Sequence, residues 1–278
     1  MTAVENQKSI SRYRCAVLFA SVLAFIMFAY ALQSVPPLLE QFQGIFGINA
    51  ATAGLLMSMA VIPGIILALP AGILISKYTF RKIGFSSTLL IAVGSLIMAL
   101  SSSFSVALLT RFIVGLGGGL LSVGTPSIVP QWFEHKEMGK AMSVYAVGMP
   151  VGTGAAFFTA PILAQSFGWQ SLFYAGALVS TLVAIFFWII VRDGPLKGIS
   201  TAKLSDAWQA VRNREVWKVS LVWMFFNIVC YWLSNVVTRS FRQVQGSDTR
   251  ECQHSLESNY DCKLPFCASL RVVFGQIG

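Results

Sequence analysis

One arginine lies in the middle of a long apolar segment, where a charged side chain is unusual. Among the apolar segments between residues 15 and 191, Arg111 is the only charged residue more than one helical turn from a segment end. A guanidinium in hydrocarbon is costly, so Arg111 must face a polar interior or reach the membrane interface. Because arginine keeps its proton, it would attract an anion or hold a partner group by hydrogen bonds. Arg111 is therefore the first candidate for solute binding.

Several other polar or aromatic side chains of the apolar segments could contact a small solute. Each of them could equally serve helix packing or lie at the membrane interface. The further candidates for solute binding are Tyr30, Gln33, Tyr145 and Asn227, and Trp132 and Thr153 are additional cavity groups. The five cysteines form no CxxC pair and the chain has only two histidines, so no metal site and no cofactor are expected.

A short basic segment separates the second apolar segment from the third. Lys77, Arg81 and Lys82 follow Gly72 and Ser76 within eleven residues. Cytoplasmic loops of membrane proteins carry such bases, which explains the charges but not the glycine before them.

The fifth apolar segment combines a proline with several glycines. These residues are Gly148, Pro150, Gly152 and Gly154. They remove backbone hydrogen bonds and side-chain bulk from one helix, which is tolerable only where neighbouring helices or water satisfy the backbone. The pattern predicts a close and moving helix contact.

The composition explains why these residues must lie in membrane helices. Of 278 residues, 55% are hydrophobic and only 11% are charged, and the mean hydropathy is +0.69. A soluble domain carries about 25% charged residues. The composition thus excludes a soluble enzyme, a disordered chain and a nucleic-acid-binding module. The net charge of +9 comes from short basic clusters between apolar segments, as membrane topology requires.

Windows of about 20 apolar residues define the expected membrane spans. Six spans are predicted at residues 15–35, 52–75, 84–102, 106–129, 139–165 and 169–191, so that residues 15–191 form a six-helix unit. A polar N-terminus at 1–14 precedes them, and a polar central loop at 192–215 leads to a seventh span at 216–237. The remainder, 238–278, contains no such window.

The basic residues predict the orientation in the cytoplasmic membrane. The N-terminus, the loops after every second span and the central loop contain the Lys and Arg, whereas the first three opposite loops contain none. The positive-inside rule therefore places the N-terminus in the cytoplasm.

Together these features resemble the major facilitator superfamily, over residues 15 to about 237. In that family the loop between helices two and three reads Gly-x-x-x-Asp-(Arg/Lys)-x-Gly-x-Arg-(Arg/Lys). Gly72, Lys77, Arg81 and Lys82 match this loop, whereas Ser76 replaces its acid and Thr79 replaces its second glycine. Ser76 cannot supply the charge latch that the acid forms in the family.

Two further family motifs have counterparts in the chain. The helix-four motif Arg-x-x-x-Gly-x-Gly is matched by Arg111, Gly115 and Gly117. The glycine–proline motif of helix five is approximated by Gly148, Pro150, Gly152 and Gly154.

The resemblance implies an all-α integral membrane protein with the six-helix N-terminal bundle of this family, a seventh span and a truncated second half. It implies a permease, not an enzyme, that moves one small solute by alternating access around a midplane site. The first half is most similar to cyanate- and nitrate-type permeases. A cavity whose one fixed charge is Arg111 would suit an organic or inorganic anion.

The expected partners are the solute and the lipid bilayer, without nucleic acid. A coupling proton is a further candidate partner, although no Asp or Glu lies within the six predicted spans to relay it. Because a bilobal carrier needs both halves to enclose its site, we expect this chain alone not to transport.

The tail at 238–278 does not fit the family, which would require further spans. One hypothesis is a frameshift near residue 246, since a one-base shift permits Gly-Trp-x-Ser-Asp-(Lys/Arg)-Leu-Gly, the loop motif expected between helices eight and nine. The alternative is a seven-span receptor or interaction protein with an extracytoplasmic tail, which carries Cys252, Cys262 and Cys267. A six-helix half that pairs with its own copy is a third possibility.

Overall fold

The computed structural model describes residues 3–192, 212–218, 220–222, 224–225 and 228–229. The chain divides into two compact units, Met1–Ala207 and Trp208–Gly278. Within the described residues, six helical segments are long and apolar enough to cross a membrane, which confirms the six predicted spans and the all-α class. The predicted seventh span is helical where it is described. Its remainder with Asn227, most of the central loop and the tail at 238–278 lie outside the described residues.

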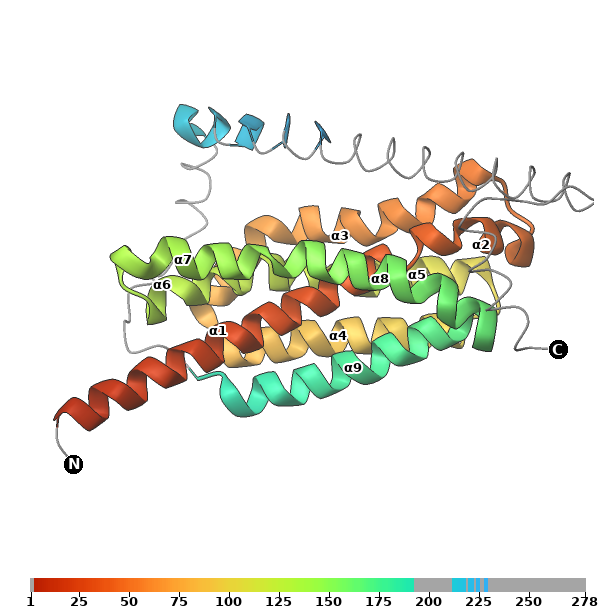
Figure 1. Ribbon diagram of the computed structural model, residues 1–278. Coiled ribbons are helices and arrows are strands. Elements are labelled where there is room, and N and C mark those ends of the chain that lie inside the picture. Colours follow the sequence, from red (N-terminus) through yellow and green to blue (C-terminus); the bar gives the residue numbers. More distant parts are fainter. Residues whose placement is uncertain (1–2, 193–211, 219, 223, 226–227, 230–278) are drawn as a thin grey trace, which may run out of the picture. The chain divides into compact units, whose positions relative to one another are not determined.

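The first unit is a bundle of long helices that run side by side (Figure 1). Its long helices are α1 (Ala3–Gln33), α3 (Ala50–Lys77), α4 (Phe80–Ala99), α5 (Phe104–Gly124), α8 (Gly148–Phe167) and α9 (Trp169–Ile190). The shorter elements are the 3-10 turns η1 (Pro36–Leu38) and η2 (Pro126–Ile128) and the helices α2 (Leu39–Phe46), α6 (Val129–Trp132) and α7 (His135–Ala146).

The two ends of the bundle serve as reference points below. At the α2 end, α1 stops and α3, α5 and α9 begin. At the α7 end lie the start of the first span, the α3–α4 turn, α6, α7 and the last turn of α9 (Figure 1).

Short polar residues and a glycine set the helix limits at the α2 end. The Asn49 side chain accepts a hydrogen bond of 2.7 Å from the amide of Thr52 and starts α3. Ser103 does the same for α5 through the amide of Val106, at 3.4 Å. Gly47 ends α2 in the left-handed conformation, with φ of 61°, which glycine adopts at little cost. These caps satisfy groups that helix ends leave unpaired.

The fifth predicted span consists of two helices, α7 and α8, with a break at Val147. Pro150 has no amide hydrogen to donate to the carbonyl of Ala146, so the helix is interrupted one turn before the proline. A Cβ added at Gly148 would lie 3.2 Å from the Phe25 ring, and one at Gly152 would meet the carbonyl of Ile26. The close helix contact predicted for this segment is therefore with α1. Movement at this contact stays a prediction.

Helix α5 packs against α1, α3 and α4. A Cβ at Gly119 would lie only 2.6 Å from the Cα of Gly64, and one at Gly115 would meet the carbonyl of Ala60. These glycines let α5 and α3 approach backbone to backbone, as small residues do between membrane helices. On the other side, α1 packs against α8 and α9, and α4 packs against α9.

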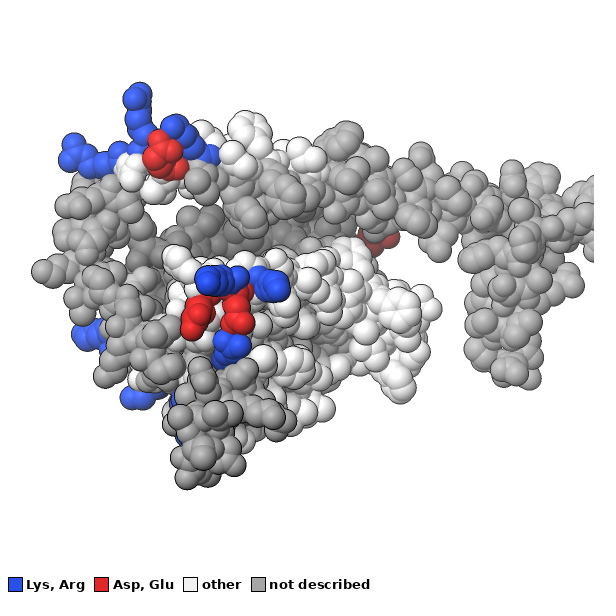
Figure 2. Space-filling model, turned by 60° about the vertical axis from the view of Figure 1, so that its left-hand side comes forward, with Lys and Arg blue, Asp and Glu red and all other residues white. Residues whose placement is uncertain are grey.

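The charged side chains of the first unit lie mostly at its α7 end. In Figure 2 the Lys, Arg, Asp and Glu at the near end of the first unit lie close together, with a white surface beyond them. Lys77, Lys82, Lys136, Lys140 and Arg192 are exposed there. This distribution supports the predicted cytoplasmic location of that end, which remains a prediction.

Candidate functional site

Arg111 lies two turns inside α5 and is 2% exposed. Its guanidinium donates three hydrogen bonds, all to main-chain carbonyls of other helices. Nη1 donates to Ala31 at 2.7 Å, Nη2 to Leu32 at 2.8 Å and Nε to Leu56 at 3.2 Å. One side chain thus joins α5 to the last turn of α1 and to the second turn of α3. The interfacial alternative is excluded, because Arg111 is buried in the bundle.

The last turn of α1 suits a cation for a physical reason. The final carbonyls of a helix have no intrahelical partner and carry the negative end of the helix dipole. Ala31 and Leu32 belong to this turn, since α1 ends at Gln33. The guanidinium of Arg111 therefore replaces water as the donor to these groups.

No carboxylate balances the charge of Arg111 in the described part of the chain. The salt bridges there join Arg14 to Glu137 and Lys218 to Glu215. The carbonyls offset the charge only partly, because each is a dipole and not an ion. Arg111 thus keeps a buried positive charge that its hydrogen-bond partners offset only in part.

Tyr30 and Gln33 lie on one face of α1, and on this face Tyr30 contacts Thr159 in α8 and Gly176 in α9. Both are half-buried. The Tyr30 hydroxyl lies 3.3 Å from Oγ1 of Thr159 in α8. Since Thr159 donates its own proton to the carbonyl of Ala155, Tyr30 is the donor in this pair. Tyr30, Gln33 and Arg111 all lie toward the α2 end of the bundle, and these three residues are the candidate site.

Tyr145 does not join this group. It is 7% exposed and lies in α7, where its ring stacks on Phe25 with centroids 4.6 Å apart. Its hydroxyl bonds to Oγ1 of Thr125 at 2.6 Å, across to the C-cap of α5. This geometry places Tyr145 in packing between α1, α5 and α7, at the other end of the bundle from Arg111. Trp132 also lies at the α7 end, against Tyr13.

The basic loop between α3 and α4 forms a contact that the sequence did not reveal. Lys77 and Lys82 are exposed, whereas Arg81 lies over the ring of Trp188, 4.2 Å from its centroid. The Nε of Arg81 also donates to the Trp188 carbonyl at 2.6 Å. Gly72 has open space around it, and the Ser76 side chain lies outside the described part. Arg81 therefore caps the last turn of α9.

Two more contacts at the α7 end were not predicted. Arg14 forms a salt bridge of 2.6 Å with Glu137, between α1 and α7. The Tyr13 hydroxyl donates to the carbonyl of Ile190 at the end of α9. Separations of more than 100 residues gave no local signal for either contact.

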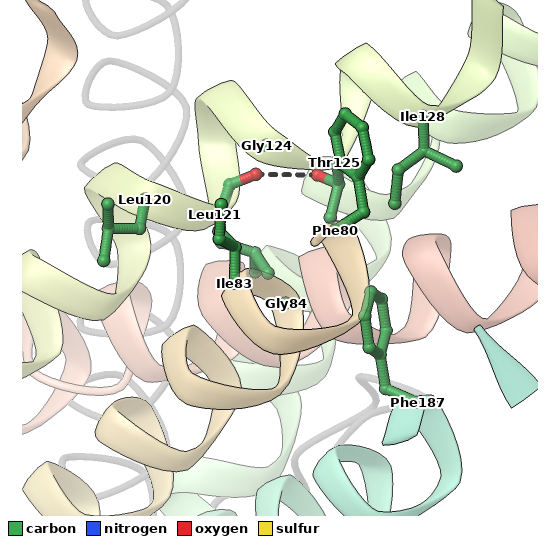
Figure 3. A pocket seen from close by; sticks show the side chains of 9 residues that line it. All are labelled: Phe80, Ile83, Gly84, Leu120, Leu121, Gly124, Thr125, Ile128 and Phe187. Atoms are coloured by element: carbon green, nitrogen blue, oxygen red, sulfur yellow. Dashed lines mark hydrogen bonds between the residues drawn. The ribbon is translucent and has the colours of Figure 1, made fainter. Parts of the chain in front are cut away.

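An apolar pocket lies between α4, α5 and α9 at the α7 end (Figure 3). Its walls include Phe80, Leu121 and Phe187, and its one hydroxyl, on Thr125, already donates to the carbonyl of Leu121 at 2.8 Å. A pocket without a free polar group cannot recognise an anion, so the candidate site remains around Arg111.

Comparison with known families decides the assignment of this helical bundle. The Major Facilitator Superfamily model matches residues 17–256. The chain belongs to the major facilitator superfamily. The predicted family is thereby confirmed, and it is a family of transporters and not of enzymes.

The similar proteins include a probable nitrate transporter and a quinolone resistance protein. The probable nitrate transporter NarT of Staphylococcus carnosus is 28% identical over 181 residues, which are 64% of this chain and 46% of NarT. The quinolone resistance protein NorB of Staphylococcus aureus is 28% identical over 183 residues, 66% of this chain and 39% of NorB. The chain thus spans about half the length of these relatives.

Solved superfamily structures share the fold of the first unit. A bacterial homolog of the human lysosomal transporter Spinster, inward-facing and unoccupied, has a TM-score of 0.57 at 21% identity. The match covers 69% of this chain and 45% of that one. The peptide transporter POT in complex with alafosfalin has a TM-score of 0.58 at 17% identity, covering 75% of this chain and 46% of its own. These similarities concern the fold alone.

The superfamily motifs thus lie at two different places in the bundle. Arg111, with Gly115 and Gly117 on the same helix, lies in α5. The loop residues and the end of α9 that Arg81 caps lie at the α7 end. Tyr30 and Gln33 lie toward the α2 end, as Arg111 does, whereas Tyr145 lies at the α7 end.

Proposed function

We propose that this chain provides the N-terminal half of a carrier that moves a small anion across the cytoplasmic membrane by alternating access. The observation that carries the anion assignment is the charge of Arg111, which is buried in the bundle and has no carboxylate partner in the described part. A buried cation without a counter-ion favours an anion as ligand. The similarity to NarT, named a probable nitrate transporter, supports the same choice.

The proposed site has a charged member and neutral members. Arg111 supplies the positive charge. Tyr30 and Gln33 are half-buried polar residues in the last turn of α1 and are proposed as neutral ligands. Two segments are proposed to take part in the conformational change. The first contains Gly72, Ser76, Lys77, Arg81 and Lys82, and the second contains Gly148, Pro150 and Gly152. Asn227 and Tyr145 remain candidate solute ligands by the sequence argument alone.

Ligand-induced stabilisation of the purified chain tests this proposal directly. An anion at 100 times its dissociation constant stabilises the folded state by about 2.7 kcal/mol. We expect nitrate to raise the unfolding temperature of the full chain in detergent, compared with gluconate at the same ionic strength. An unchanged unfolding temperature with nitrate, chloride and cyanate would exclude the anion assignment.

The similarity to NorB supports a second candidate, a carrier for quinolone-like drugs. The same assay with norfloxacin distinguishes the two, because a drug carrier would be stabilised by norfloxacin and not by nitrate. Proton coupling is tested by repeating the nitrate titration over a range of pH.

Transport needs a separate test, since a carrier of this family encloses its site between two halves. We expect no nitrate uptake in cells that express this chain alone. Uptake on co-expression with the second half of NarT would support its role as a first half. Uptake by the chain alone would instead favour a carrier made from two copies.

The receptor alternative and the frameshift hypothesis concern the tail at 238–278. A disulfide among Cys252, Cys262 and Cys267 would favour the receptor. Non-reducing and reducing gels of the chain distinguish these cases. Sequencing of the gene across codons 238 to 278 tests the frameshift.

A further inference from the structure

Arg111 donates hydrogen bonds to carbonyls of two helices, α1 and α3. These two sets of bonds differ in how easily they can break. The guanidinium has five N–H donors, of which three bond to Ala31, Leu32 and Leu56. The residue is 2% exposed. An anion can therefore contact the guanidinium only if some of the covering atoms move away.

The attachment to α3 is fixed by the packing around it. Leu56 is fully buried in α3. One turn further along α3 the carbonyl of Ala60 lies so close to Gly115 in α5 that no side chain would fit between them. Gly119 and Gly64 continue the same contact along α3 and α5. Moving the Leu56 carbonyl would require separation of two backbones in direct contact, which carries the cost of a broken core.

The attachment to α1 involves the end of a helix. Ala31 and Leu32 lie in the last turn of α1, which stops at Gln33. The carbonyl of Ala31 also accepts a hydrogen bond of 2.9 Å from the hydroxyl of Ser34, which is 1% exposed. If Arg111 leaves, the Ala31 carbonyl keeps a donor and only the partly buried Leu32 carbonyl loses one, so the penalty for unsatisfied acceptors is reduced.

We propose that a bound anion and the carbonyls of Ala31 and Leu32 compete for the same guanidinium. This inference rests on the proposed function, because it assumes an anion at Arg111. A guanidinium attracts an anion more strongly than a neutral carbonyl in a buried site, because opposite charges add to the hydrogen bond, so an anion can displace the carbonyls. Arg111 then stays attached to α3 through Leu56 and releases α1. Anion binding thereby loosens the last turn of α1 while the α3–α5 contact is kept.

Hydrogen–deuterium exchange of the full chain in lipid nanodiscs tests the competition. Amide exchange reports local opening of a helix segment. We expect nitrate to speed exchange in peptides that cover residues 28–34 and to leave peptides from residues 56–64 unchanged. Gluconate at the same ionic strength is the control. Unchanged or slower exchange at 28–34 under conditions where nitrate stabilises the chain would overturn the competition and leave the proposed function standing.

Two variants test the roles of the donors. In Arg111→Lys a compact ammonium cannot bridge two helices, so residues 28–34 should exchange fast without nitrate and gain nothing from it. In Ser34→Ala the Ala31 carbonyl would lose its second donor on displacement of Arg111. The nitrate concentration that gives half of the exchange response should then rise at least about fivefold, as expected for one unsatisfied buried acceptor. A response of Ser34→Ala at the wild-type nitrate concentration would contradict the proposed role of Ser34.

If nitrate neither stabilises the chain nor changes exchange anywhere, the proposed function fails, and the competition fails with it. The stabilisation assay and the exchange assay therefore separate the two failures.

Discussion

Arg81 stacks on the ring of Trp188 and also donates a hydrogen bond to the carbonyl of the same residue. The guanidinium carbon lies 4.2 Å from the ring centroid, and Nε lies 2.6 Å from the carbonyl oxygen. Trp188 is in the last turn of α9, where carbonyls lack intrahelical partners. A residue of the basic loop thereby ties α4 to the end of α9. This contact gives Arg81 a role that charge topology alone does not require.

Replacement of Arg81 should destabilise the first unit. Arg81→Lys keeps the charge but loses the planar stacking on Trp188, and we expect a loss of about 1 kcal/mol in the free energy of unfolding. Arg81→Ala should lose more, because the helix end also loses its donor. The measurement is denaturant unfolding in detergent. Lys82→Ala, at an exposed neighbour, is the matched control and should be neutral.

The contact between α3 and α5 should not tolerate a side chain at Gly119. A Cβ there would lie 2.6 Å from the Cα of Gly64, so both backbones would have to shift. We expect Gly119→Ala to cost about 1–3 kcal/mol, as overpacking of a core does. Gly54→Ala in α3 has open space and is the control. Equal unfolding temperatures for the two variants would contradict this account of the contact.

The salt bridge between Arg14 and Glu137 should contribute only modestly to stability. Its Arg14 and Glu137 side chains are 26% and 47% exposed, so solvent and salt weaken the attraction. A double-mutant cycle with Arg14→Ala and Glu137→Ala should give a coupling of about 0.2–1 kcal/mol. The coupling should fall as salt is added. A coupling that does not respond to salt would instead indicate a desolvated pair.

Tyr145 provides a test of packing against solute binding. Its hydroxyl donates to Thr125, because Thr125 gives its own proton to Leu121. Loss of this bond in Tyr145→Phe should cost about 1 kcal/mol of stability. We expect the nitrate titration to keep its midpoint in this variant. A shifted midpoint of the nitrate titration would indicate that Tyr145 contacts the solute, as the sequence predicted.

The orientation can be read from cysteine accessibility. In a variant whose five cysteines are replaced by serine, Lys82→Cys at the α7 end and Gln41→Cys in α2 introduce single thiols at exposed positions. A membrane-impermeant maleimide should label Gln41→Cys in intact cells and Lys82→Cys only in inverted vesicles. The opposite pattern would reverse the predicted topology.

The sequence by itself determined the membrane character, the six spans and the family. These properties depend on long apolar windows, on clustered bases and on motif spacing, all of which are local along the chain. The sequence also identified Arg111, because a charged residue within an apolar segment can be recognised without knowing what it contacts. It also predicted a close contact at Gly148 and Gly152, without naming the helix on the other side.

Only the tertiary structure decided what these residues contact. Arg111 bonds to carbonyls 55 to 80 residues away, and a main-chain carbonyl carries no mark of residue type that a sequence could show. For the same reason Arg81 could not be assigned to the end of α9. Tyr145 and Tyr30 look alike in sequence, yet Tyr145 bonds to Thr125 at the α7 end and Tyr30 bonds to Thr159 in α8. Helix packing sets these neighbours, because each pairing joins segments that are distant along the chain.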